Sequence, residues 1–477
     1  MPLLGRGLPH LLSMKTKARG AKSKSPKIHL DSLVQTEPDA AGIDIAHREH
    51  WCAVPAGRCE SPVRAFGTFT EDLEAMADWL AECGIKTVAM ESTGVYWIAA
   101  FQVLERRGFA VCLVNARHVK NVSGRKSDVL DCQWLQRLHS YGLLNASFRP
   151  ADQMCVLRSY LRYRDELVCA RSVQCLHMQK GLQQMNVQLH QVLSDVTGVS
   201  GLRIIEAILA GERDVRKLAE LVDCRVRASQ ATVRKALAGD YRAEHLFVLR
   251  CAHDLHQTYQ EKIARCDEQI VAQLARLPDR VKVQEKPVPP RKAGRPARLD
   301  LVAGKDLRAE LYRCTGVDLT AIESIGVLTA QVVISEAGLD MTRWRTEKHF
   351  ASWLGLCPDN RISGGKVLSR RTRRVLNPLA DALRMAATTL QQSKTALGAF
   401  YRRMKARLGS PAAITATAHK LARLIYRLLK HGELYVRQGL DDYERKHRER
   451  VLQHLNKTAA NLGFQLTPQT PPAVSVS

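Results

Sequence analysis

The chain has 477 residues, enough for two or three globular domains, and 45% of them are hydrophobic. Its thirteen cysteines include no Cys-x-x-Cys pair, which argues against a structural zinc site and a disulfide framework, and no apolar run is long enough to cross a membrane. Seventy-two Lys and Arg against 47 Asp and Glu give a formal net charge of +25, which favours a polyanion such as nucleic acid as partner, in a reducing cytoplasm.

The first part of the chain is predicted to be a disordered basic arm, residues 1–37, followed by an α/β domain, residues 38–150. Within the domain, strand-like runs alternate with helical ones, which is typical of helices packed on a central sheet. We expect Thr70 to cap the first helix. The expected strands lie at 40–54 (two strands joined by a tight turn), 66–69, 85–90 and 110–114, and the expected helices at 70–83 and 95–107.

Four acidic residues in this domain occupy positions in or next to predicted strands and helices from which they could bind a metal ion. Asp44 is inside an apolar strand, where an unpaired acid is unfavourable, and Glu91 directly follows a buried strand. Asp128 and Asp131 are three residues apart at the start of a predicted helix that Ser127 could cap, so they share one helical face. Alone, Asp128 and Asp131 also fit an ordinary helix-start role and Glu91 an ordinary loop role, whereas Asp44 is the acid that such a role explains least. Taken in this order, they favour Mg²⁺, which prefers hard oxygen ligands and acts together with substrate phosphates.

Residues 151–285 are predicted to form a helical coiled-coil region. Apolar residues recur at alternating spacings of three and four between positions 175 and 192, and again between positions 249 and 270. We expect the first of these stripes to lie on one helical stretch over 152–196. Two stripes indicate either an antiparallel helical hairpin or pairing with a helix of another subunit.

A basic, proline-rich segment, residues 286–300, is predicted to be a linker or a nucleic-acid-contacting arm. It leads into a mainly α-helical C-terminal domain, residues 301–440. A tail follows over residues 441–477, and we expect its end to be disordered.

The C-terminal domain contains a serine before two glycines, followed by a run of cations. Gly364 and Gly365 let the backbone turn sharply directly after Ser363. Between residues 361 and 374 there are six basic residues and no acid, and guanidinium groups match phosphate oxygens, so Ser363 could attack a phosphodiester. Ser369 is the second candidate nucleophile. The expected nucleic-acid contacts are Arg125, Lys126, Arg361, Lys366, Arg370, Arg371, Arg373 and Arg374.

The order of these motifs resembles transposases of the insertion sequence 110 family, with the 1111 subgroup nearest, over about residues 38–400. The carboxylate set resembles the family's RuvC-like DEDD domain, which has an RNase H-type α/β fold. The segment from Leu319 to Ala387 resembles its C-terminal transposase domain. His47 departs from the pattern, because a lysine is expected there, and the basic arm has no counterpart that we can place.

The resemblance implies a recombinase that excises and inserts a mobile DNA element. Ser363 would form a covalent bond to a DNA phosphate, and the carboxylates would bind Mg²⁺ beside it. A structured bridge RNA would pair with donor and target DNA, and the enzyme would be a homo-oligomer, from dimer to tetramer. The chain has no phosphate-binding P-loop, which fits, because a covalent phosphoserine retains the bond energy needed for rejoining. The metal ligands carried over are Asp44, Glu91, Asp128 and Asp131.

Two other functions stay open on the sequence. A RuvC-like nuclease that cleaves DNA junctions with water would use the carboxylates and leave Ser363 as a phosphate contact. A catalytically silent RNA-binding scaffold would bind RNA without breaking DNA. The presence of all four carboxylates argues against the scaffold.

Overall fold

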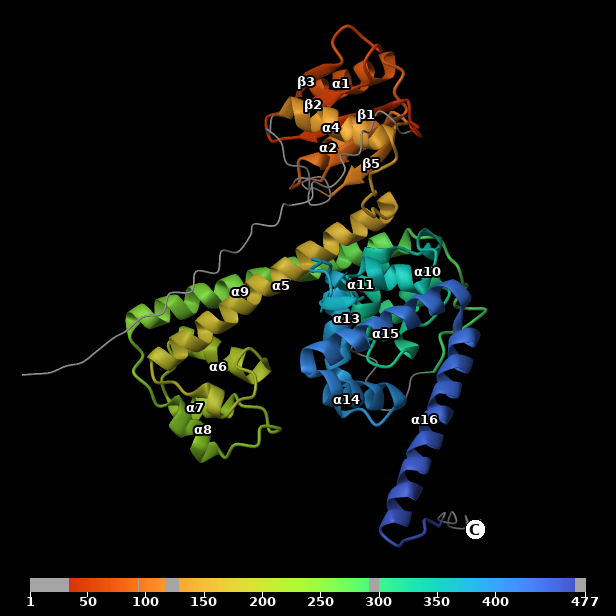
Figure 1. Cartoon of the computed structure of the whole chain (residues 1–477). Coiled ribbons are helices and arrows are strands. Elements are labelled where there is room, and N and C mark those ends of the chain that lie inside the picture. The colour runs from red at the N-terminus through yellow and green to blue at the C-terminus, as the bar shows by residue number, and fades with distance from the viewer. Residues whose placement is uncertain (1–33, 93, 116–127, 291–299, 468–477) are drawn as a thin grey trace, which may run out of the picture. The chain divides into compact units, whose positions relative to one another are not determined.

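The computed structural model describes residues 34–92, 94–115, 128–290 and 300–467, and its contacts divide the chain into two units, Met1–Arg149 and Pro150–Ser477 (Figure 1). Some sequence predictions fall outside the described residues. These are most of the basic arm, Arg125, Lys126, the Ser127 cap, most of the linker at 286–300 and the end of the tail.

The first unit is built on a five-stranded mixed sheet in the order β3-β2-β1-β4-β5. The first three of these neighbours pair antiparallel, and β1, β4 and β5 pair parallel. The predicted α/β class is therefore confirmed. The strands are β1 (Ala40–Ile45), β2 (Glu49–Ala53), β3 (Val63–Gly67), β4 (Thr87–Glu91) and β5 (Ala110–Val114), and the helices are α1 (Thr70–Glu82), α2 (Trp97–Arg106) and α4 (Asp128–Ser140).

The two faces of this sheet carry different layers. Ile43 and Met90 point into the apolar core that the sheet forms with α1 and α2. Because side chains alternate along a strand, the residues between them face the other way, toward α4. On that face Thr87 Oγ1 lies 2.8 Å from Nε2 of His139, which belongs to α4.

Helix α1 begins at Thr70, where the predicted helix begins, but Thr70 is not its cap. Phe69, not Thr70, is the N-cap residue, and its side chain makes no cap hydrogen bond. The backbone N–H of Phe69 instead donates to Asp72 Oδ2 at 3.1 Å. The expected Thr70 cap was therefore wrong, because an acid in the first turn satisfies the backbone at this helix start.

The second unit opens with two long helices, α5 (Asp152–Gln184) and α9 (Ala243–Ala275), which run side by side (Figure 1). Gln273 Nε2 donates to the carbonyl of Gln153 at 3.3 Å near one end, whereas Gly181 packs on Leu249 at the other. The two helices are therefore antiparallel. This antiparallel pair is one of the two arrangements expected, whereas a coiled coil along the predicted stripes stays a prediction.

The prediction of one helical stretch over 152–196 was wrong at its C-terminal end. α5 stops at Gln184, Asn186 takes a left-handed conformation (φ 59°), and only a short 3₁₀ turn, η2 (Leu189–Gln191), follows. The apolar residues beyond the helix, among them Met185 and Leu189, are buried in a second core with α6–α8. Burial in that core outweighs continuation of the helix. The covering helices are α6 (Val199–Leu209), α7 (Val215–Glu220) and α8 (Gln230–Leu237).

The rest of the second unit is mainly helical, as predicted. α15 packs against α12, α13 and α14, and α16 extends from it over residues where only a tail was expected (Figure 1). The helices are α10 (Leu307–Thr315), α11 (Val327–Ala337), α12 (Glu347–Trp353), α13 (Pro378–Thr389), α14 (Ala396–Leu408), α15 (Ser410–His431) and α16 (Glu433–Asn461). The short elements are β6 (Leu301–Val302), β7 (Lys305–Asp306), η4 (Leu319–Ala321), η5 (Met341–Arg343), β8 (Arg361–Ser363), β9 (Lys366–Ser369) and η6 (Leu390–Gln392). None of the described helices is long and apolar enough to span a membrane.

Candidate functional site

Asp44 and Glu91 lie at the carboxyl ends of two neighbouring parallel strands. The register pairs Ile43 of β1 with Met90 of β4, so the next position on each strand is one of these acids. Both acids are half-buried, and strand alternation turns them away from the core formed with α1 and α2. They therefore share the sheet face that α4 covers.

Helix α4 lies close against this face and runs opposite to β1. Gly42 sits under the helix backbone at Cys132 and Gln136, and Gln136 Nε2 donates to the carbonyl of Ala40 at 3.3 Å. Later residues of α4 thus lie over earlier residues of β1. The start of α4, with Asp131, is consequently directed toward the strand ends.

The thiol of Cys132 is close to two of the carboxylates. Burial is the main cause that raises its pKa, and the negative charges of Asp44 and Asp131 raise it further, although the backbone N–H of Gln133 acts in the opposite direction. The resulting pKa is about 12. Because both acids act on one thiol, β1 and α4 bring their carboxylates into the same neighbourhood.

These residues fit a divalent cation by their chemistry. Asp44, Glu91 and Asp131 offer carboxylate oxygens on one face at one end of the sheet, the ligand type that Mg²⁺ prefers. Asp128 is the first residue of α4, and helical spacing places its position one turn before Cys132. Among the described side chains, no three His, Cys, Asp or Glu are close enough to enclose an ion.

Gly42 is the residue that lets α4 approach the sheet. A Cβ added there would lie 2.3 Å from the Gln136 nitrogen and 2.4 Å from the Cys132 oxygen, and both are backbone atoms. We expect Gly42→Ala to lower the free energy of unfolding of the first unit by about 1–3 kcal/mol, because the helix must move away. Calorimetric unfolding of the full chain measures this change.

Gly181→Ala is the matched control for that substitution. Its added Cβ would meet no heavy atom closer than 3.7 Å, so ordinary packing accommodates it within α5. We expect the control to leave stability unchanged or to raise it by about 0.5–1 kcal/mol. A first unit as stable with Gly42→Ala as with glycine would contradict the close packing of α4 on β1.

In the second unit, Ser363 ends one strand of a tight β-hairpin. β8 and β9 pair antiparallel, with Ser363 opposite Lys366. Gly364 and Gly365 form the two-residue turn with φ of 54° and 74°, the left-handed values that a type I′ turn requires. Ser363 is exposed beside this turn, with the Lys366 side chain directly across the ladder.

The base of the hairpin is attached to the helical body. Asp359 N–H donates to the Arg371 carbonyl at 2.9 Å, Pro358 and Thr372 form a further bridge, and Arg373 Nη2 donates to the Ser352 carbonyl at 2.8 Å. Over the described residues, none of the hairpin cations forms an ion pair, so their charge is available to a ligand. These cations are Arg361, Lys366, Arg370, Arg371, Arg373 and Arg374.

The sequence pattern predicted the serine and the cations but not the hairpin. A two-glycine centre flanked by Arg-Ile-Ser and Lys-Val-Leu is a pattern that favours a two-residue β-turn, and it could have predicted these strands. The importance of Gly42 was also missed, because only the packing of α4 reveals it.

Comparison with known proteins gives matches over both parts of this arrangement. The family model of the IS110 DEDD domain, described as "Transposase", matches residues 41–187, and the model described as "Transposase IS116/IS110/IS902 family" matches residues 318–402. The chain is also 26% identical over 357 residues to a "Probable family 20 transposase" of Pseudomonas aeruginosa, covering 73% of this chain and 85% of the relative.

These matches define a DNA-processing enzyme with a DEDD-type domain, a class for which a divalent metal cation is expected. The first model spans the four predicted carboxylates and the second spans the Ser363 hairpin. The chain belongs to the IS110 family of transposases.

Proposed function

We propose that this transposase excises and inserts a mobile DNA element through attack of Ser363 on a DNA phosphate, with a covalent phosphoserine intermediate. The observation that carries the proposal is the hairpin. It holds an exposed serine beside a tight two-residue turn, next to cations that form no ion pairs among the described residues. Such a geometry can bring a hydroxyl to a backbone phosphate and neutralise the charge that develops there.

The proposed step is a transesterification. Ser363 Oγ bonds to phosphorus while one bridging P–O bond of the strand breaks. The serine loses its hydroxyl proton, and the departing sugar oxygen takes one up. In the second step a sugar hydroxyl loses its proton and bonds to phosphorus, while the P–Oγ bond breaks and Ser363 takes up a proton. The strand is thus rejoined without ATP.

We further propose that Asp44, Glu91, Asp128 and Asp131 bind Mg²⁺ in a RuvC-like arrangement. The shared face of Asp44, Glu91 and Asp131 supports this assignment. When bound, the metal supplies Lewis-acid stabilisation of charge on the phosphate oxygens. The carboxylates would hold the metal ion in place, and their number and hard oxygen atoms would favour Mg²⁺ over softer metal ions.

The proposed partners are DNA, a structured guide RNA and further copies of the chain, up to a tetramer. The net charge of +25 supports a large polyanionic ligand. Delegating sequence choice to base pairing would leave the protein to read backbone and shape. The cations around Ser363, which form no ion pair with the residues that the structure describes, fit that kind of backbone contact.

A covalent-adduct experiment tests the proposed chemistry. The full chain is incubated with element DNA, its RNA and Mg²⁺, the nucleic acid is digested, and peptides are searched by mass spectrometry for a nucleotide remnant. We expect the remnant on Ser363. Cleaved DNA with no adduct on any peptide would instead support a water-using, RuvC-like nuclease.

A further inference from the structure

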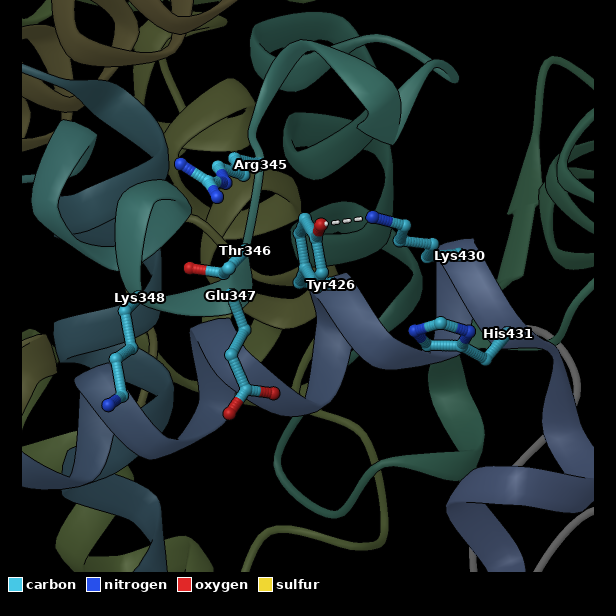
Figure 2. Close-up of a pocket in the computed structure, with 7 residues that line it drawn as sticks. All are labelled: Arg345, Thr346, Glu347, Lys348, Tyr426, Lys430 and His431. Atoms are coloured by element: carbon cyan, nitrogen blue, oxygen red, sulfur yellow. Dashed lines mark hydrogen bonds between the residues drawn. The ribbon is translucent and has the colours of Figure 1, made fainter.

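A basic hollow of about 380 Å³ lies in the second unit, between the segment that starts α12 and the end of α15. Figure 2 shows Lys348 on one side, Lys430 and His431 on the other, and Tyr426 between them. Arg345 completes the cationic lining. These residues come from segments about eighty positions apart, which the packing of α12 on α15 brings together.

The acid in the hollow is already neutralised by arginines of α15. Glu347 Oε1 accepts from Arg423 Nε at 2.8 Å and from Arg427 Nη2 at 2.8 Å. Burial acts to raise the pKa of Glu347, but the two guanidinium groups outweigh it and hold the pKa below its usual value. Glu347 is therefore ionised at neutral pH, and its carboxylate is already paired with Arg423 and Arg427 of α15.

The cations at the rim have no such partner. Within the described part of the chain, neither Arg345, Lys348 nor Lys430 forms an ion pair, and the one side-chain contact of Lys430 at hydrogen-bond distance is the Tyr426 hydroxyl at 2.8 Å. Tyr426 is fixed in turn by donating to the Trp344 carbonyl at 2.8 Å. The hollow is thus an open site with excess positive charge.

The hollow and the base of the Ser363 hairpin both adjoin α12. Cys357 Sγ contacts the Lys348 carbonyl at 3.9 Å, and Arg373 anchors on Ser352 of α12. The charges of Arg373 and Arg423 both act on the Cys357 thiol, opposing the effect of burial on its pKa. α12 thus carries a contact of the hairpin base, through Ser352, and one wall of the hollow, through Lys348.

We propose that this hollow binds the phosphodiester backbone of nucleic acid, as a second contact for the strand held at the Ser363 hairpin. The inference rests on the proposed nucleic-acid function but not on the serine chemistry. Single point charges such as Lys348 and Lys430 suit phosphates without reading sequence. The ligand can be DNA or RNA, since both carry the same backbone charge.

The test compares Arg345→Gln/Lys430→Gln with a matched control, Arg234→Gln/Lys235→Gln. The control removes two exposed cations of α8, which does not belong to the hollow. Binding of the full chain to labelled single-stranded DNA, duplex DNA and RNA of equal length is measured across a salt series. We expect the hollow variant to bind about 10-fold more weakly and its salt slope to fall by about 2, with the control near wild type.

The probe with the largest loss identifies which nucleic acid occupies the hollow. Equal behaviour of the two double variants on all three probes would overturn the proposal. The adduct on Ser363 separates this result from the catalytic one. If the hollow variant has an altered salt slope but wild-type protein forms no adduct, the hollow binds nucleic acid and the serine mechanism is wrong. If wild-type protein forms the adduct but the slope of the hollow variant is unaltered, the serine mechanism stands and the proposal for the hollow is wrong.

Discussion

Replacing Ser363 by alanine is expected to abolish strand breakage while DNA binding stays close to wild type. The substitution removes the proposed nucleophile, and losses on the order of 10⁶-fold follow removal of a catalytic nucleophile. The exposed side chain has no packing role in the hairpin, so stability should change by less than about 0.5 kcal/mol. Single-turnover cleavage of element DNA, with binding measured in parallel, checks both parts.

Ser369→Ala is the control, because the same residue type stands on the partner strand of the same hairpin. Ser369 pairs with Arg361, and its Oγ accepts the Arg371 N–H at 3.2 Å. We expect the cleavage rate of this variant to fall by less than about 10-fold, because the substitution shifts the hairpin only slightly. The reverse pattern would transfer the nucleophile to Ser369. Full cleavage by both variants would support hydrolysis by water.

The candidate catalytic residues could be predicted from the sequence better than the tertiary contacts around them. An acid inside an apolar strand and a serine before two glycines are local features, so Asp44 and Ser363 could be named from the sequence. The pairing of β1 with β4, which sets Asp44 beside Glu91, depends on long-range register. No local pattern specifies that register.

The errors have the same physical origin. The predicted helix over 152–196 followed an apolar period of three and four, but the residues after Gln184 pack into a core made with the helices that follow, α6–α8, and with α9. The hollow beside Glu347 could likewise not be predicted from the sequence, because its cations come from α15 and from a segment about eighty positions earlier that includes Arg345 and the start of α12. Local pattern predicts element type well, and tertiary packing decides where elements end and which side chains meet.

The proposed mechanism divides its parts between the two units. The carboxylates belong to the first unit and Ser363 to the second, so catalysis requires them to meet within one chain or between subunits. A variant in the first unit should therefore remove chemistry without altering the hairpin. A substitution at Asp44, on β1 of the first unit, therefore tests the proposed metal site without touching the Ser363 hairpin.

Asp44→Asn is expected to lower Mg²⁺-dependent cleavage by about 10³-fold, because metal charge stabilisation contributes several kcal/mol. Asparagine keeps the shape of the side chain but removes its charge, so β1 should stay paired as before. Cleavage rates across a Mg²⁺ titration, with Mg²⁺ binding measured by calorimetry, separate a lost ion from a lost fold. The mapped adduct on Ser363 should disappear in parallel.

The control for this prediction is Asp39→Asn, one residue before the other end of β1. Asp39 forms surface ion pairs with Arg58 and with Lys86, at 2.5 Å and 2.7 Å, and its charge lies at the strand end opposite to Asp44. Exposed pairs of this kind contribute little, so cleavage and Mg²⁺ binding should stay within about 3-fold of wild type. If Asp44→Asn and Asp39→Asn cleave alike, the carboxylates at the ends of β1 and β4 do not serve the reaction, and the positive charge around Ser363 must carry it alone.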